Sequence, residues 1–240
     1  MKKFLILSAL SIASTATICK VFGEDIKYGI EAVTGFRSNY VQRGFEVAET
    51  TLDFQIETEV AINDDTFVNV GAWYATETGG GDFDEAAFFA HVRHEYSKQL
   101  AVGFSATYRN IDPSSDVFDP GFDDGVEAGF FSTWSFNKNL SATAGIYYDT
   151  AAEGLYANLE ANYSRTISEK LFFSSKLGIS VVDDYYGRNG LNDLYARLSL
   201  TYLVSDTVSI TPFVGTSILL DDDDPGDSST YAGLWFEVSF

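Results

Sequence analysis

The sequence has 240 residues, with 35 Asp and Glu against 15 Lys and Arg, and a formal net charge of −20. So acidic a chain is unsuited to nucleic acid or to anionic phosphate surfaces, and we expect no nucleic-acid partner. Aromatic residues make up 15% of the chain and there are only 4 prolines, a composition that favours β structure.

The first 23 residues have the pattern of a secretory signal peptide. A basic pair, Lys2 and Lys3, precedes an apolar run that ends at Ile18, and small residues before Glu24 suit cleavage there. The single cysteine, Cys19, raises the alternative of a lipoprotein, but the bulky residue before it is unlike a lipoprotein signal. Loss of three lysines with this segment would change the formal charge from −20 to −23.

After the signal peptide, apolar and polar residues alternate with a period of two almost everywhere. In TLDFQIETEVAI, Leu52, Phe54 and Ile56 fall on one face, with Asp53 and Glu57 on the other. Most such runs are long enough for a tilted strand to cross a bilayer. Twelve runs are present, at 27–43, 51–62, 66–76, 85–96, 100–111, 126–136, 140–148, 155–166, 171–182, 194–204, 207–220 and 230–240.

Short and long connections alternate between these runs. The short ones are 63–66, 97–99, 137–139, 168–170 and 205–207. The long ones contain 20 of the 35 carboxylates, with Arg188 as their only base, and lie at 44–50, 77–84, 112–125, 149–154, 183–193 and 221–229. Short turns on one rim and long loops on the other are typical of a transmembrane barrel. We therefore predict an all-β, up-and-down antiparallel β-barrel of about 12 strands, formed by residues 24–240, in the bacterial outer membrane.

The final strand supports this prediction, because it alternates without a break up to the terminal residue. We expect it to pair with the first strand and close the barrel. The aromatic end resembles the C-terminal signal of bacterial outer-membrane barrels, which the β-barrel assembly machinery recognises, and Phe236, Val238 and Phe240 would carry that signal. The alternative is a soluble barrel or sandwich, whose apolar face would point inward.

Part of the chain resembles a known family. The segments FRSNYVQRGFEVAETTLDFQIE (36–57) and NVGAWYATE (69–77) are similar to an uncharacterised bacterial outer-membrane family named for a Gly-Cys-Trp motif. The family's Ser-Asn-Tyr-x-x-Arg-Gly stretch corresponds to residues 38–44, and Ala72 stands at the position of the motif's cysteine. The resemblance covers about the first third of the mature chain, and it implies a barrel but no known reaction.

If the polar face points inward, the lumen has eight acids, five bases and one histidine. A mixed set of this kind could form a salt-bridge network that plugs the barrel, or it could line a narrow wet channel with a cation bias. The predicted lumen-lining residues are Glu31, Arg37, Asp53, Glu57, Glu59, His91, Arg93, Glu95, Arg109, Glu127, Glu160, Lys176, Arg197 and Glu237.

The sequence contains no convincing catalytic group. His91 shares the polar face but has no evident serine partner, and there is no Gly-x-Ser-x-Gly motif, so we predict no enzyme activity and no catalytic residues. A calcium site in the last long loop is an alternative to simple solvation of its charge, since clustered carboxylates suit Ca²⁺. Its ligands would be Asp221, Asp222, Asp223, Asp224 and Asp227, and no other cofactor is expected.

The leading functional prediction is a narrow, porin-like channel for small solutes with a cation bias. The alternative is a non-conducting surface barrel whose acidic external loops bind cations, lipopolysaccharide or partners. In either case we expect a monomer in contact with outer-membrane lipid and lipopolysaccharide.

Overall fold

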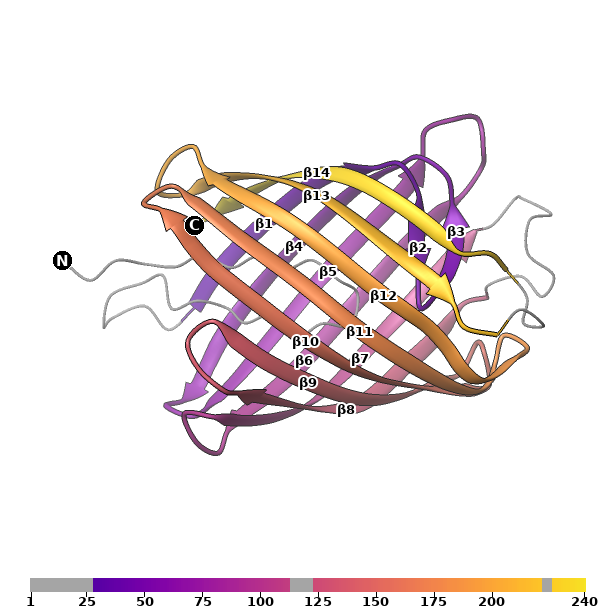
Figure 1. Ribbon diagram of the computed structural model, residues 1–240, viewed down its shortest axis with the longest axis horizontal. Coiled ribbons are helices and arrows are strands. Elements are labelled where there is room, and N and C mark those ends of the chain that lie inside the picture. Colours follow the sequence, from indigo (N-terminus) through magenta and orange to yellow (C-terminus); the bar gives the residue numbers. More distant parts are fainter. Residues whose placement is uncertain (1–27, 113–122, 222–225) are drawn as a thin grey trace.

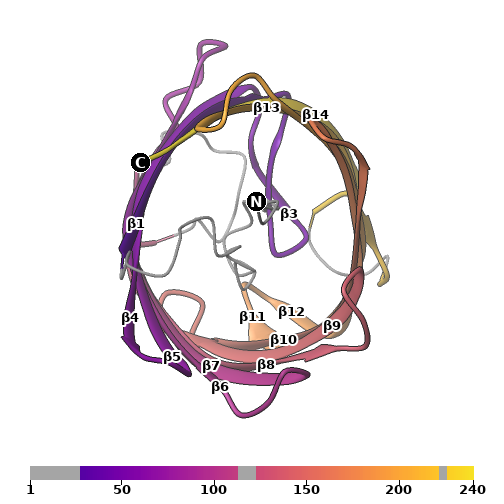
Figure 2. The ribbon, with the colours of Figure 1, turned by 90° about the vertical axis from the view of Figure 1, so that its left-hand side faces the viewer.

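The computed structural model describes residues 28–112, 123–221 and 226–240. They form a closed antiparallel β-barrel with a small two-stranded hairpin inside it (Figures 1 and 2). Within these residues no helix is long and apolar enough to span a membrane. The predicted signal peptide lies outside the described residues.

Twelve strands form the barrel wall, which confirms the predicted fold class. They are β1 (Tyr28–Arg37), β4 (Thr51–Asn63), β5 (Thr66–Glu77), β6 (Asp84–Glu95), β7 (Leu100–Asp112), β8 (Gly125–Ser135), β9 (Leu140–Asp149), β10 (Gly154–Ser168), β11 (Leu171–Tyr185), β12 (Arg188–Leu203), β13 (Val208–Leu219) and β14 (Ser229–Ser239). Each pairs with its neighbours along the chain, and β14 pairs with β1 to close the ring. The N–H of Phe240 donates to the carbonyl of Ile30 at 2.9 Å, so the last strand is bonded up to its end.

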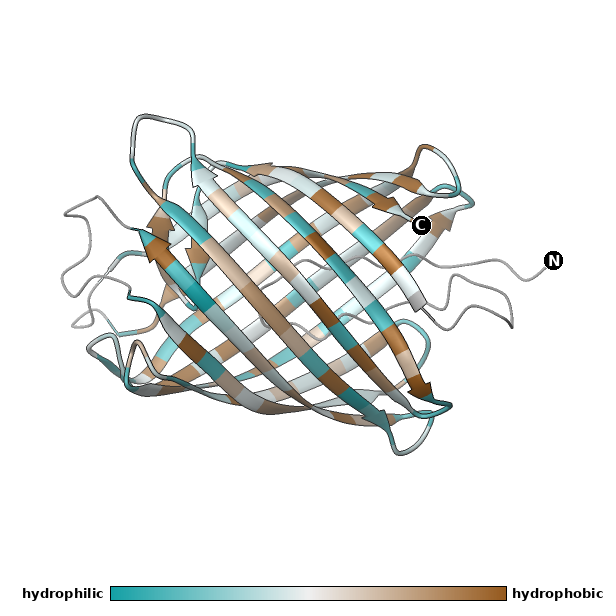
Figure 3. Cartoon of the chain, turned by 180° about the vertical axis from the view of Figure 1, so that it is seen from behind, coloured by the Kyte–Doolittle hydropathy of each residue, from teal (hydrophilic) through white to brown (hydrophobic). Residues whose placement is uncertain are grey.

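The alternation in the sequence corresponds to an apolar outer face and a largely polar inner face. On β4, Phe54 and Ile56 are 49% and 55% exposed, whereas Asp53, just before Phe54, is buried. Phe88 and Phe130 on other wall strands are more exposed still, at 62% and 66%. Figure 3 shows hydrophobic (brown) and hydrophilic (teal) residues alternating along the strands. A soluble barrel would bury these side chains. The outer face therefore suits lipid, and with the closed barrel it assigns the chain to the bacterial outer membrane.

One predicted long loop, at 183–193, is wrong. β11 continues to Tyr185 and β12 already begins at Arg188, so the connection is a two-residue turn. Tyr186 and Gly187 have φ angles of 48° and 80°, and two successive positive φ angles are the pattern of a type I′ hairpin turn. Asp193 and Arg188 consequently belong to a wall strand, and both are buried rather than solvated at the rim.

The predicted strand at 27–43 is wrong in its second half. β1 ends at Arg37, and the backbone N–H of Ser38 donates to the carbonyl of Ala232 on β14 at 2.8 Å. The chain then leaves the wall and enters the lumen as β2 (Tyr40–Gln42) and β3 (Phe45–Ala48), which pair with each other. Alternation continues through this departure, because a hairpin strand has the same period as a wall strand.

The hairpin of β2 and β3 lies inside the ring of strands, as the view along the barrel in Figure 2 shows. Arg43 and Gly44 form its two-residue turn, with φ angles of 52° and 86°. Tyr40, Phe45 and Val47 of this inward hairpin are buried in one hydrophobic cluster with aromatic side chains of the wall. The hairpin lies near the long-loop end of the barrel, and its side chains form part of the candidate functional site in the lumen.

Candidate functional site in the barrel lumen

All fourteen residues predicted to line the lumen lie on the inner face, and none has a fully exposed side chain. Arg37, Asp53, Arg109, Glu127, Glu160, Lys176 and Glu237 are buried. Glu31, Glu57, Glu59, His91, Arg93, Glu95 and Arg197 are half-buried. The fourteen do not form one cluster, because they are divided among several strands and between the two ends of the barrel.

Ion pairs join many of these side chains across neighbouring strands. Nε of Arg37 on β1 donates to the carboxylate of Asp53 on β4 at 2.7 Å. Nζ of Lys176 on β11 lies 3.1 Å from Glu160 on β10. Arg93 on β6 also contacts Glu95 of its own strand at 2.7 Å and Glu59 on β4, two strands away, at 3.4 Å. Such pairs compensate the cost of burying each charge alone.

The short-turn half of the lumen has an excess of negative charge. Glu31 on β1 and Glu57 on β4 stand directly opposite each other in the strand register, an arrangement in which like charges repel. Glu57 accepts a hydrogen bond from the amide of Gln55 at 2.8 Å. Glu237 of β14 accepts one from Ser209 at 2.6 Å.

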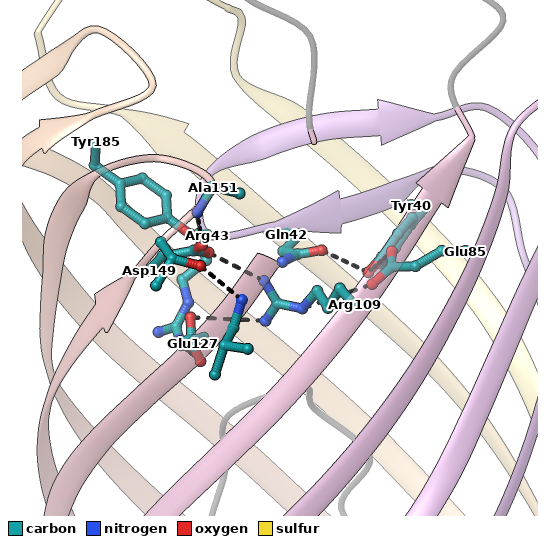
Figure 4. Close-up of polar contacts among 11 residues, drawn as sticks. Tyr40, Gln42, Arg43, Glu85, Arg109, Glu127, Asp149, Ala151 and Tyr185 are labelled. Atoms are coloured by element: carbon teal, nitrogen blue, oxygen red, sulfur yellow. Dashed lines mark hydrogen bonds and ion pairs between the residues drawn. The ribbon is translucent and has the colours of Figure 1, made fainter. Parts of the chain in front are cut away.

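Arg109 on β7 is the central cation of the long-loop half (Figure 4). Its guanidinium lies 3.6 Å from Glu85, 3.6 Å from Glu127 and 3.5 Å from Asp149, which come from three different strands. Of the three, only the contact with Asp149 is a hydrogen bond, and it is a long one, so the carboxylates surround Arg109 mainly by their charge.

The inward hairpin inserts polar groups between these charges. The Gln42 amide lies 2.5 Å and 3.1 Å from two nitrogens of Arg109 when its oxygen faces the guanidinium. In that orientation the amide nitrogen donates to the Tyr40 hydroxyl at 2.7 Å. The same hydroxyl donates to Glu85 at 2.9 Å. β2 is thereby connected to two wall strands.

The tip of the hairpin inserts Arg43 into the far wall. Its Nη2 lies 2.5 Å from Glu127 of β8, and its Cζ lies 3.7 Å from the ring centre of Tyr156 and 4.6 Å from that of Tyr147. Burial lowers the pKa of the Arg43 guanidinium, but Glu127 and the nearby tyrosines raise it by more, so its pKa lies above the ordinary value. Arg43 therefore stays charged in this site.

Side chains of β12 hold the turn from the other side. Nη1 of Arg188 donates to the carbonyl of Gly44 at 3.3 Å, and the guanidinium lies 3.6 Å above the ring of Phe45. Nδ2 of Asn192 donates to the carbonyl of Arg43 at 2.9 Å. Side chains of the wall thus bond both carbonyls of the turn.

These contacts show that the hairpin extends across the lumen. It leaves the wall between β1 and β4, and Arg43 contacts β9 and β10. Four strands separate β4 from β9 on one side of the ring, and four separate β1 from β10 on the other. The tip therefore meets the wall diametrically opposite the point of departure, and the hairpin obstructs the long-loop half of the barrel.

The residues that hold the hairpin are largely those that the sequence did not single out. Tyr40 and Arg43 fall in the predicted first strand, and Asp149 and Arg188 in predicted loops. The adjacent Arg43–Gly44 pair is a turn signal within an alternating run, and it could have indicated the hairpin. The stretch 38–44 that carries the family resemblance enters this hairpin and forms its turn.

His91 stacks on Phe89, with 5.3 Å between ring centres. Ser105 of β7 stands opposite it in the register, but no hydrogen bond between the two is found in the described part of the chain. A nucleophile and base in hydrogen-bonding contact are the minimum for serine-type catalysis.

The predicted calcium ligands Asp222, Asp223 and Asp224 lie outside the described residues. Asp221 and Asp227 are described and exposed. No group of three or more potential metal ligands occurs among the residues that the structure covers. In the predicted assembly signal, Phe236 and Phe240 point outward with 43% and 67% exposure, and Val238 is half-buried.

The fold is that of known outer-membrane barrels. The chain is similar to the KdgM porin solved with disordered oligogalacturonate, with a TM-score of 0.58 and 9% identity over 88% of this chain and 99% of that one. It is similar to the NanC porin, with a TM-score of 0.56 and 8% identity over 87% and 98% of the two chains. It is also similar to an outer-membrane channel from Pseudomonas putida F1, with a TM-score of 0.58 and 9% identity over 92% of this chain and 98% of that one.

These identities are too low to show more than a shared fold. LpxR from Salmonella typhimurium has the same kind of barrel, with a TM-score of 0.54 and 8% identity over 88% of this chain and 99% of that one. No protein-family model matches the chain, and no curated protein matches it. The chain is therefore a porin-like outer-membrane β-barrel in architecture.

Proposed function

We propose that the barrel is a narrow channel for small solutes with a bias toward cations. The observation that carries the proposal is a closed twelve-strand wall whose inner face is lined with charged side chains. A filled structural barrel would be stabilised more by apolar side chains than by many buried ions, so an ionic lining favours solute passage. The similarity to porins and channels supports the same function.

The cation bias is proposed from the short-turn half. Glu31 and Glu57 face each other across two wall strands, and Glu237 lies on a neighbouring strand. A narrow passage beside such a group raises the local concentration of cations and repels anions. We propose no catalytic role for the barrel and no resident cofactor.

A second candidate is a barrel that the hairpin keeps closed. The observation that favours it is the network of contacts by which Tyr40, Gln42 and Arg43 connect the hairpin to the wall strands β6, β7 and β8. In this case function would lie in external loops that contact cations, lipopolysaccharide or partner proteins. We propose a monomer for either candidate, folded with the aid of the β-barrel assembly machinery.

Planar-bilayer recording of the refolded chain 24–240 separates the two candidates. Heat-dependent mobility on a gel first establishes that the barrel is folded. The channel proposal predicts steady unitary current steps and a reversal potential, in a salt gradient, on the cation side. A folded chain that gives no current in many insertions would favour the closed barrel.

A further inference from the structure

The wall residues around Arg43 form a recognisable binding site, which we call the cation cage. It consists of the carboxylate of Glu127 and the ring faces of Tyr147 and Tyr156. All three side chains are buried, and they come from the adjacent strands β8, β9 and β10. One carboxylate with two aromatic faces is the arrangement by which proteins bind organic cations.

Arg43, which occupies the cage, belongs to the inward hairpin and not to the barrel wall. The backbone hydrogen bonds of the hairpin run between β2 and β3, and the attachments of its turn to the wall are made through wall side chains. Arg43 itself has a positive φ angle, which is uncommon for a residue other than glycine. Withdrawal of the tip would break no strand pairing of the barrel wall.

We propose that the cation cage binds organic cations with a guanidinium or primary amine group, and that Arg43 is a tethered occupant which such a solute displaces. The solute class is thus that of arginine-like and polyamine-like molecules. This proposal depends on the proposed channel function in one respect: a solute must enter through the barrel lumen to reach the cage.

The chemistry of the cage selects between classes of cation. Guanidinium is planar and weakly hydrated, so it can stack between ring faces while pairing with a carboxylate. Sodium and calcium are strongly hydrated and prefer several oxygen ligands. One carboxylate offers them too few, and the cage should therefore discriminate against inorganic cations.

The test is calorimetric titration of agmatine, which has a guanidinium and an amine, into the refolded chain 24–240 in detergent. Arg43→Ala empties the cage, and we expect it to bind agmatine at least about tenfold more tightly than the unaltered chain. The double variant with Glu127→Gln should lose that gain. Sodium chloride at the same ionic strength should give no heat of binding.

Arg93→Ala is the matched control. Arg93 also pairs with carboxylates and lies over a ring, that of Phe67 at 4.7 Å, but it belongs to a wall strand. Its removal changes the charge equally and should leave the affinity for agmatine at that of the unaltered chain. If Arg93→Ala gains the same affinity, the effect is a general one of charge and the cage is not a site.

A second measurement uses the chain without substitution. If agmatine displaces Arg43, amide hydrogen exchange of residues 40–48 should become faster with agmatine while that of the wall strands stays unchanged. Arg43→Gln serves in the calorimetry if the alanine variant does not fold. Absence of binding by the variant, with no change in exchange, overturns the inference. If the barrel conducts ions but does not bind agmatine, only the proposal of the cation cage is contradicted. If it binds agmatine but does not conduct, only the channel proposal is contradicted.

Discussion

At the scale of single residues, the lumen is organised as buried charges whose partners lie on neighbouring strands. Arg37 and Asp53 are the clearest case, since Asp53 is 1% exposed and Arg37 also lies 4.7 Å from the ring centre of Tyr40. A buried charge that loses its partner is costly, because neither water nor another cation replaces the lost interaction.

Arg37→Met should therefore destabilise the barrel by about 3–5 kcal/mol, since Asp53 remains buried without its guanidinium. Urea unfolding in detergent micelles, followed by tryptophan fluorescence, measures the change. Arg165→Met is a suitable control, because Arg165 is exposed. Its effect should stay within about 0.5 kcal/mol. If both variants lose the same free energy of unfolding, the Arg37–Asp53 pair does not stabilise the barrel more than an exposed arginine does.

The facing carboxylates predict ion selectivity. Glu57→Gln removes one charge from the pair with Glu31, and we expect the cation-to-anion permeability ratio to fall. Reversal potentials in a salt gradient give the ratio. Asp206→Asn removes the same charge from an exposed short turn at the rim of the barrel and should leave the ratio nearly unchanged. A larger effect from Asp206 would place the selectivity at the rim.

At the scale of elements, the inward hairpin is what the sequence did not predict. The alternation sufficed to group wall residues by face, because the side-chain period is fixed by strand geometry. It could not show that the chain leaves the wall after Arg37, because β2 alternates as β1 does. Asp149 and Arg188 were missed for a related reason: both stand beside turns, where charge is usually solvated. Only contacts between distant segments identify them as lumen residues.

The turn of the hairpin can be tested at one glycine. A Cβ on Gly44 would lie 3.0 Å from atoms of both Arg188 and Asn192, and its φ angle is 86°. Gly44→Ala should therefore loosen the hairpin, and amide exchange of residues 40–48 should become about tenfold faster or more, given a strain of 1–2 kcal/mol.

Gly190→Ala separates backbone strain from the contact with the wall. Gly190 has a similar φ angle of 89°, but a Cβ there would meet nothing within 4 Å. This variant should leave hydrogen exchange in the hairpin unchanged. If both variants loosen residues 40–48 equally, the contacts of Gly44 with β12 do not hold the hairpin in place.

At the scale of the whole molecule, the barrel has two unlike halves. Carboxylates dominate the half near the short turns, and the hairpin, with Arg43 and its aromatic rings, occupies the half near the long connections. In the proposed channel, the wall would provide the passage and the hairpin would determine how much of it is open. Sequence alternation was enough to predict the wall, whereas the balance between channel and plug depends on how one connection folds inward.

The most direct measurement is the unitary conductance of two chains, the unaltered barrel and a variant in which residues 40–48 are replaced by a short Gly-Ser linker. Shortening the loop at Gly79 and Gly80, where a side chain would meet nothing, controls for the effect of altering a connection. We predict small cation-selective steps for the unaltered chain and for the control, and clearly larger steps for the variant without the hairpin. A folded barrel that stays silent without its hairpin would contradict the account, because the wall itself would then provide no passage.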